Sequence, residues 1–366
     1  MPFTAAKRKN TLSGIFLVAI FATAATLIAN MEAIRNLGIS ALVVGIVLGI
    51  VFANTLHGKM PSAWDGGVTF SGKKILRFAI VFYGFRITFQ QIGEVGIEGF
   101  MVSLLVLSST MILGIFLGIR VFGLDRDTSI LTASGASVCG AAAVLATEPV
   151  LKSEDYKTAI AVSMVVLFGT ISMFLYPVLY ATIIAPSSGY LHMSPEVFGM
   201  YVGGTIHEVA QVVAVPASVP GAGETMANTA VIVKMTRVIM IAPMLIVLGL
   251  VMGIMAKRSG GEAGKMQLVI PWFAVYFVGM AGLNSLIHNY TLTAPVEMAT
   301  MIKGVIDNIN MVDTFLLTMA MTALGMGTRF AKFKGLGLAP IYTAGSMFIW
   351  LVVGGFVITQ WVVATF

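Results

Sequence analysis

The feature that most constrains this chain is a series of apolar runs, each long enough to cross a bilayer. A transmembrane helix needs about 20 mostly apolar residues, and about eleven segments of the 366-residue chain meet or nearly meet that length. Only 10% of the residues are charged, against about 25% in soluble domains. The sequence therefore predicts an all-α polytopic membrane protein, with one transmembrane domain over residues 1–366 embedded in the lipid bilayer. The predicted spans are residues 12–29, 38–56, 70–90, 100–120, 128–148, 157–184, 197–215, 226–255, 268–289, 309–328 and 341–363.

The placement of Lys and Arg predicts the orientation of these spans. With the N-terminus in the cytoplasm, about 14 basic residues fall on the cytoplasmic side and about 4 on the other, which is the positive-inside bias. They form short clusters between apolar runs, so the net charge of +6 does not indicate a nucleic-acid partner. No evident cleavage site follows the first run, so we expect a retained helix. We predict a cytoplasmic N-terminus and a C-terminus on the opposite, periplasmic side.

Two similar segments predict an inverted repeat. Residues 127–132 (DTSILT) open the fifth span, and residues 313–318 (DTFLLT) open the main part of the tenth. Spans that are five apart run in opposite directions, as an inverted repeat requires. We therefore predict an extra N-terminal helix (12–29) and two five-helix repeats (38–184 and 197–363), with broken fifth and tenth helices that cross. A second similar pair, residues 135–139 and 203–207, joins spans predicted to run in the same direction, so we exclude it from the repeat.

The fifth span is rich in Gly, Ser, Thr and Ala between residues 127 and 150. This composition predicts a helix that breaks around Ser137, Cys139 and Gly140, because irregular backbone inside a membrane is tolerated only against protein or water. The N-terminus of a half-helix can bind an anionic group. Close helix packing through small residues is the alternative. Gly325, Gly327 and Thr328 in the tenth span form the predicted second break, and both breaks are assigned to substrate binding.

Charged and polar side chains within the seventh and eighth spans are the other candidates. Lys234 and Arg237 lie three residues apart on one helix face, and cations at that depth need anionic partners. We assign them to substrate binding, since the arginine fork suits sulfate, sulfonate or carboxylate groups. His207, Glu208 and Gln211 are assigned to coupling or to the transport pathway. A satisfied polar cluster that joins helices is the alternative for these three residues.

Arg86 in the third span and Asn284 in the ninth are further pathway candidates. A position at the membrane interface is the alternative for Arg86, and helix-to-helix hydrogen bonding is the alternative for Asn284. The sequence has one cysteine and no cluster with metal-ligand spacing, and it has no phosphate-binding loop. We therefore predict no metal site, no cofactor and no catalytic residues.

Four motifs together resemble one family. They are residues 137–150 (SVCGAAAVLATEPV), 205–213 (TIHEVAQVV), 234–238 (KMTRV) and 323–328 (ALGMGT). In this order they are similar to the bacterial YeiH-like sulfate exporter family, and the resemblance runs from about residue 38 to the C-terminus. It implies an inner-membrane protein related to the cation/proton antiporters and anion transporters, with five-helix inverted repeats and two crossed broken helices. It also implies that spans four to six and nine to eleven form one bundle, and spans two, three, seven and eight another.

The expected function is secondary transport of a small anion, sulfate or a sulfonate, by alternating access with coupling to H+ or Na+. An intramembrane enzyme that uses Cys139 or Ser137 with His207 is one alternative, and an anion channel is another. The sequence leaves the coupling ion, the direction of transport and a homo-oligomeric state open.

Overall fold

The computed structural model describes residues 8–32, 34, 40–56, 58, 60–258, 272–333 and 337–366. Every regular element in these ranges is helical, as the apolar runs predict. Six helices are long and apolar enough to cross a membrane: Arg8–Ala29, Phe89–Val121, Tyr156–Ile184, Gly223–Ile254, Val296–Gly327 and Leu338–Thr365. Helices occupy the other five predicted segments too, but these are shorter, interrupted or less apolar, so the count of eleven spans is not confirmed. The predicted starts at residues 38 and 268 lie outside the described residues.

Contacts divide the chain into two units. The first unit comprises Met1–Glu94, Pro216–Ala222 and Trp272–Ala331, and the second comprises Val95–Val215, Gly223–Pro271 and Lys332–Phe366. This division differs from the expected bundles, because spans seven and eight join spans four to six, and spans nine and ten join spans two and three. Side-chain contacts described below hold these spans together. Each unit draws on both predicted five-helix halves, so the inverted repeat stays a prediction.

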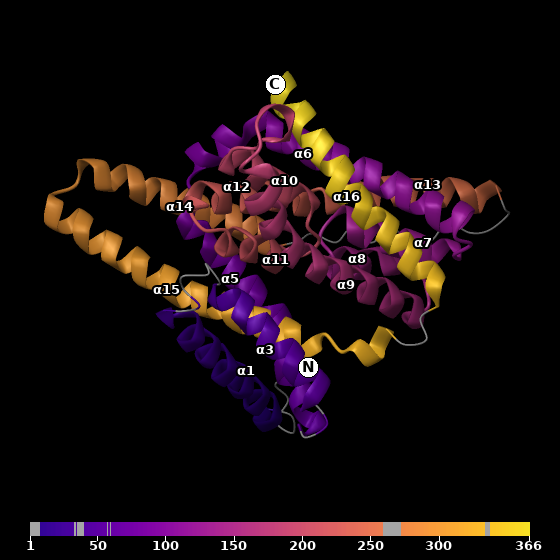
Figure 1. Cartoon of the computed structure of the whole chain (residues 1–366), viewed down its shortest axis with the longest axis horizontal. Helices are drawn as coiled ribbons and strands as arrows, with labels where there is room; N and C mark the ends of the chain where they lie inside the picture. The colour runs from indigo at the N-terminus through magenta and orange to yellow at the C-terminus, as the bar shows by residue number, and fades with distance from the viewer. Residues whose placement is uncertain are drawn as a thin grey trace. The chain divides into compact units, whose positions relative to one another are not determined.

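The first unit is built on the pairing of α3 with α15 (Figure 1). Its core includes Val18, Phe52, Val68 and Met319, from four different helices. Its elements are α1 (Arg8–Ala29), α3 (Ala41–Thr55), η2 (Ser62–Trp64), α4 (Asp65–Phe70), η3 (Ser71–Ile75), α5 (Leu76–Tyr83), η4 (Gly84–Arg86), η8 (Pro216–Ser218), α14 (Trp272–Thr293) and α15 (Val296–Gly327).

The predicted break in the tenth span is wrong. α15 is a continuous 32-residue helix that ends only at Gly327, and Gly325 lies inside it. A Cβ on Gly325 would lie 3.0 Å from the Cα of Gly49 on α3. Small residues at such positions let two helix backbones approach closely. Gly325 therefore serves packing and does not interrupt the helix.

Replacing Gly49 with Ala tests this close approach. The new Cβ would lie 2.8 Å from Met326 N and 2.9 Å from Gly325 Cα, and still closer to Thr322 O. Because backbone atoms cannot move aside cheaply, we expect a loss of about 1–3 kcal/mol of stability. Thermal unfolding of the purified protein measures it. Gly279→Ala on α14, where a Cβ meets nothing within 4 Å, is the control and should leave the unfolding temperature unchanged or raise it.

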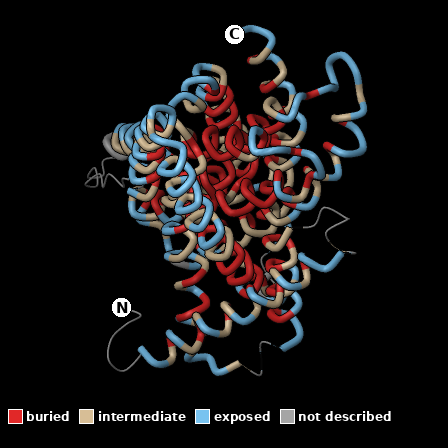
Figure 2. Tube along the Cα trace, turned by 90° about the vertical axis from the view of Figure 1, so that its left-hand side faces the viewer, coloured by how far each residue is buried: buried red, intermediate tan, exposed pale blue. Residues whose placement is uncertain are grey.

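The second unit surrounds α7 and α12. Along its last helix, α16, buried and exposed positions alternate at helical spacing, as expected for a helix with protein on one side and lipid on the other (Figure 2). Its elements are α6 (Phe89–Phe116, kinked at Gly96 near the boundary of the units), η5 (Leu117–Val121), α7 (Arg126–Ser137), α8 (Ala141–Leu151), α9 (Asp155–Leu179), η6 (Tyr180–Ile184), η7 (Gly189–Leu191), α10 (Pro195–Thr205), α11 (Val209–Ala214), α12 (Gly223–Ile239), α13 (Ile241–Arg258) and α16 (Leu338–Thr365); η9 (Phe330–Phe333) lies at the boundary.

Asp125 fixes the start of α7. Its carboxylate accepts a hydrogen bond from Thr128 N at 3.1 Å. The same carboxylate forms an ion pair with Lys157 Nζ on α9 at 3.1 Å. Lys157 also pairs with Asp127 at 3.2 Å. Burial acts to raise the pKa of Asp125, but the Thr128 and Lys157 donors outweigh it and hold that pKa below its ordinary value. This ion-pair cluster joins the first turns of α7 and α9.

Candidate functional site

Two helices of the second unit break next to each other. The chain leaves α7 at Ser137 and resumes a helix at Ala141, and it leaves α10 at Thr205 and resumes at Val209. All residues from 128 to 140 are buried, as are residues 198–207. The break around Ser137 to Gly140 is therefore confirmed as a feature inside the protein and away from lipid. The second break lies at residues 206–208, in the segment that was excluded from the repeat.

Backbone conformation explains why both helices stop. Gly140 has a φ of 75°, which strains residues with a side chain. Ile206 and Glu208 have extended backbones, with ψ values of 144° and 143°. Glu208 then starts α11 as its N-cap and forms a capping box with Gln211, whose Oε1 accepts from Glu208 N at 3.2 Å. Gly140 thus fits the backbone of the first break, and the Glu208–Gln211 capping box starts the helix that follows the second.

Lys234 and Arg237 of α12 bind the carbonyl groups that the breaks leave without helical partners. Arg237 donates from Nε to Ser137 O at 2.6 Å and from Nη2 to Ala136 O at 2.7 Å. Lys234 Nζ donates to Val138 O at 2.9 Å and to Ile206 O at 2.6 Å. Both side chains are fully buried. They stand at the C-terminal ends of α7 and α10, where the helix dipole favours positive charge.

Glu208 occupies the opposite kind of helix end. Its Oε1 accepts a hydrogen bond from Ala141 N, at the N-terminus of α8, at 3.0 Å. A Cβ on Gly140 would lie 2.6 Å from that same oxygen, so the glycine makes room for the carboxylate. The N-terminus of a half-helix favours negative charge. Glu208 therefore lies where the sequence predicted an anionic ligand.

His207 and Gln211 complete the cluster with buried polar atoms that lack partners. His207 Nδ1 and Gln211 Nε2 have no hydrogen-bond partner among the described residues. Gln211 packs against Gly169 of α9, where a Cβ would lie 2.9 Å from Nε2. Buried polar groups are normally hydrogen-bonded. The unpartnered atoms indicate that this part of the site has spare capacity for a ligand or water.

Tyr176 is a member of the surrounding shell that sequence analysis missed. Its hydroxyl donates to Thr205 Oγ1, on the last residue of α10, at 3.0 Å. The ring stacks on Tyr201 with centroids 4.9 Å apart. Both tyrosines are buried. Among the many aromatic residues of an apolar chain, nothing in the sequence distinguishes these two.

Ser137 and Cys139 lie at the break without a catalytic arrangement around them. Ser137 Oγ donates to Ser134 O at 3.3 Å and to Met111 Sδ at 3.7 Å. Cys139 is a buried free thiol. Since a nucleophile needs a base within hydrogen-bond reach, these contacts do not resemble a nucleophile–base pair with His207.

The remaining predicted site residues belong to the first unit. Asn54 on α3 holds the end of α15 by donating to Thr328 O at 3.0 Å and accepting from Phe330 N at 2.8 Å, so Gly325, Gly327 and Thr328 form a capped helix end. Asn284 on α14 donates to Ile87 O at 3.0 Å, between η4 and α6. Arg86 pairs with Asp313 on α15 at 3.4 Å.

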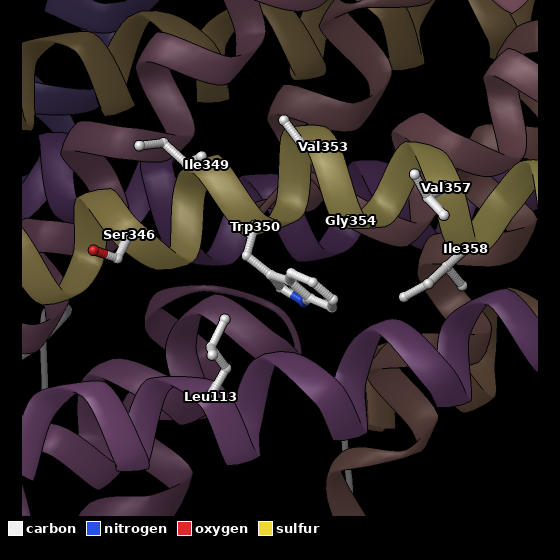
Figure 3. A pocket seen from close by; sticks show the side chains of 8 residues that line it. All are labelled: Leu113, Ser346, Ile349, Trp350, Val353, Gly354, Val357 and Ile358. Carbon is white, nitrogen blue, oxygen red and sulfur yellow. The ribbon is translucent and has the colours of Figure 1, made fainter. Parts of the chain in front are cut away.

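A cavity of about 450 Å³ in the second unit lies apart from this cluster. It is bounded by α6 and α16, and its lining is apolar except for Ser346 and the Trp350 indole (Figure 3). The indole Nε1 donates to Ser109 Oγ at 3.2 Å. Such a lining offers no charge to an anion, so we place the candidate site at the two helix breaks.

Comparison with known proteins gives the family. The family model described as conserved hypothetical protein 698 matches residues 13–344. The chain belongs to the UPF0324 family of membrane proteins. It is 45% identical over 352 residues to a UPF0324 membrane protein of Pseudomonas putida, covering 96% of this chain and 93% of that one. It is 44% identical over 345 residues to the UPF0324 inner membrane protein YeiH of Salmonella typhimurium, covering 94% and 92%. No solved structure gives a significant match. The resemblance to YeiH-like proteins is confirmed, and relatives in the UPF0324 family are named as inner membrane proteins.

Proposed function

We propose that this UPF0324 protein is a secondary transporter of a small anion, sulfate or a sulfonate, working by alternating access. One observation carries the proposal: two fully buried cations, Lys234 and Arg237, bind the carbonyls of two adjoining helix breaks, where the carboxylate of Glu208 also lies. The formal charge of the three side chains is +1. Charged residues within membrane-spanning segments are costly and mark transport pathways. A bound anion balances this charge.

The contacts suggest how the anion binds. Arg237 is engaged with backbone carbonyls, so it contributes charge and holds the break in shape. Lys234 has three N–H donors, of which two bind carbonyls, and the third is free to take an anion oxygen. In the proposed mechanism Glu208 holds the α8 N-terminus while the site is empty. The substrate anion displaces Glu208, and protonation of that carboxylate couples transport to H+.

Several finer predictions accompany this proposal. We propose eleven spans, made up of one extra N-terminal helix and two inverted five-helix repeats, with a cytoplasmic N-terminus and a periplasmic C-terminus in the inner membrane. A homo-oligomer is compatible with the proposal and is not required by it. We propose no catalytic role, since Ser137 donates to a carbonyl and a thioether. Saturable flux with counterflow in proteoliposomes distinguishes a transporter from a channel.

The test is a thermal-shift screen of purified protein with sulfate, sulfite, short alkyl sulfonates and short carboxylates. We expect at least one of these anions to raise the unfolding temperature. Glu208→Gln removes the internal competitor, so the affinity for that anion should rise by about tenfold, equivalent to about 1.4 kcal/mol. Wild-type affinity should also rise as pH falls, because protons remove the competing charge, whereas the affinity of Glu208→Gln should not change with pH.

Glu224→Gln provides the matched control. Glu224 is an exposed residue in the first turn of α12, the helix that carries Lys234. Its replacement should leave anion affinity and its pH dependence unchanged. If no anion stabilises the wild-type protein, the anion site is wrong. If an anion binds equally well to wild type and Glu208→Gln, the site stands and the displacement mechanism is wrong.

A further inference from the structure

A second buried ionisable cluster lies in the first unit, on α15. Asp313 has a completely buried side chain, and its Oδ1 has no hydrogen-bond partner among the described residues. Oδ2 pairs with Arg86 Nη2 at 3.4 Å. The same nitrogen donates to Asn310 O at 2.6 Å and to Thr314 Oγ1 at 2.8 Å. Both of these hydrogen bonds are shorter than its contact with Asp313. The carboxyl group is thus only weakly satisfied.

A second unpartnered acceptor lies close by on the same helix. Asn310 Oδ1 is also buried and without a hydrogen-bond partner among the described residues. Residues three apart on a helix are neighbours on one face. Two buried acceptors with no donor are costly, but one proton on the carboxyl group would turn it into a donor. A single proton would then satisfy Asp313 Oδ1 and Asn310 Oδ1 together.

The surroundings of Asp313 favour a proton over a metal cation. The residue lines a cavity of about 420 Å³ with apolar side chains such as Phe78, Phe82 and Leu316. A hard metal cation requires several oxygen ligands, and Arg86 repels it at short range. A proton needs only one oxygen and one acceptor. The Arg86 side chain is 28% exposed, so the cluster reaches the surface of the protein.

Arg86, from η4, is the charged group that faces Asp313. The helix α3, which packs along α15, contains no charged residue. The other titratable or charged residues on α15 and on the elements packed against it lie outside this ion pair. Tyr83 of α5 is buried and has Arg86 over its ring, 5.1 Å from the centroid, and Asp65 of α4 is half-buried. The remaining ones are exposed: Arg8, Lys9, Lys73, Lys74, Arg77, Tyr276, His288, Tyr290, Glu297, Lys303 and Asp307. Arg77 lies instead over the ring of Phe273.

We propose that Asp313 is a reversible proton-binding site, with Arg86 as its counter-ion and Asn310 as the acceptor of the bound proton. A proton from solvent adds to Oδ1, the carboxylate becomes a carboxylic acid, and the O–H donates to Asn310 Oδ1. Loss of the negative charge releases Arg86 from its ion pair with Asp313. This site lies in the first unit and shares no residue with the proposed anion site at the α7 and α10 breaks.

Infrared difference spectroscopy of the purified protein, titrated from alkaline to acidic pH, tests the proposal without any substrate. The wild type should gain the carbonyl band of a protonated carboxylic acid, and that band should shift in heavy water. Because Glu208 and the exposed carboxylates also protonate in this titration, the signal of Asp313 is the component of the band that differs between wild type and Asp313→Asn. Asp313→Asn should lose one such component, whereas Asp307→Asn, which removes an exposed carboxylate on the same helix, should retain it. An identical set of band components in wild type and Asp313→Asn overturns the proposal.

Two further measurements keep the result unambiguous. Asp313→Glu retains a carboxyl group, so if Asp313→Asn fails to fold the glutamate variant should show a displaced, pH-dependent band. Asn310→Leu removes the acceptor and should shift the carbonyl band of the wild type to the position of an unbonded acid. No shift in Asn310→Leu indicates that the amide is oriented with its NH2 group towards Asp313, which overturns the assigned acceptor.

A cation titration at constant pH distinguishes a proton site from a metal site. Displacement of the band by Na+ but not by choline indicates a metal site and overturns the proton assignment.

Discussion

Replacing Arg237 with Met should unfold or strongly destabilise the protein. The variant keeps a long side chain but leaves the carbonyls of Ser137 and Ala136 buried without their donors. At about 1–3 kcal/mol for each orphaned carbonyl, the expected loss is about 2–6 kcal/mol. Thermal unfolding of the purified protein, with gel filtration to measure the folded fraction, checks this result.

Two variants define what the effect of Arg237→Met means. Arg120→Met removes an exposed arginine from the same unit and should change the unfolding temperature little. Arg237→Lys retains the charge but loses the planar fork, so its stability should lie between wild type and Arg237→Met. Equal stability of Arg237→Met and Arg120→Met would show that the carbonyl contacts do not support the breaks.

The second large effect is expected for Gly140→Val. The left-handed backbone at φ 75° strains a residue with a Cβ by about 1–2 kcal/mol. The valine side chain would also collide with the Glu208 carboxylate, whose Oε1 lies 2.6 Å from the position of the new Cβ, at a cost of about 1–3 kcal/mol. Together these effects should lower stability by about 2–5 kcal/mol, measured by thermal unfolding.

Gly123→Val separates the two causes of this loss. Gly123 also has a left-handed φ, 67°, but a Cβ there meets nothing within 4 Å. The Gly123→Val variant should therefore show the backbone strain without the collision of side chains, and it should lose less stability than Gly140→Val. If the two variants lose equal stability, Glu208 does not lie against Gly140. The double variant Gly140→Val with Glu208→Ala should recover part of the loss, because the colliding carboxylate is absent.

The sequence by itself determined the class of protein and the first break. Apolar runs of membrane length leave helices as the means of satisfying backbone polar groups in lipid, and the structure is helical throughout its described residues. The small residues between 128 and 140 predicted a buried, broken span, because such side chains gain little from facing lipid. The buried position of Lys234 and Arg237 followed from their charge in the middle of an apolar run.

Only the tertiary structure decided where the second break lies and what the buried charges contact. Gly325 and the Gly203–Gly204 pair look alike in sequence, since glycine suits both a break and close packing. In the structure Gly325 packs on Gly49 within a continuous α15, whereas the chain after Gly204 leaves the helix at Thr205. The two shortest hydrogen bonds of Arg237 go to backbone carbonyls about 100 positions away along the chain, and a sequence does not show which carbonyl a side chain will meet. Sequence patterns record what a side chain requires, and the three-dimensional packing of distant segments determines which group meets that requirement.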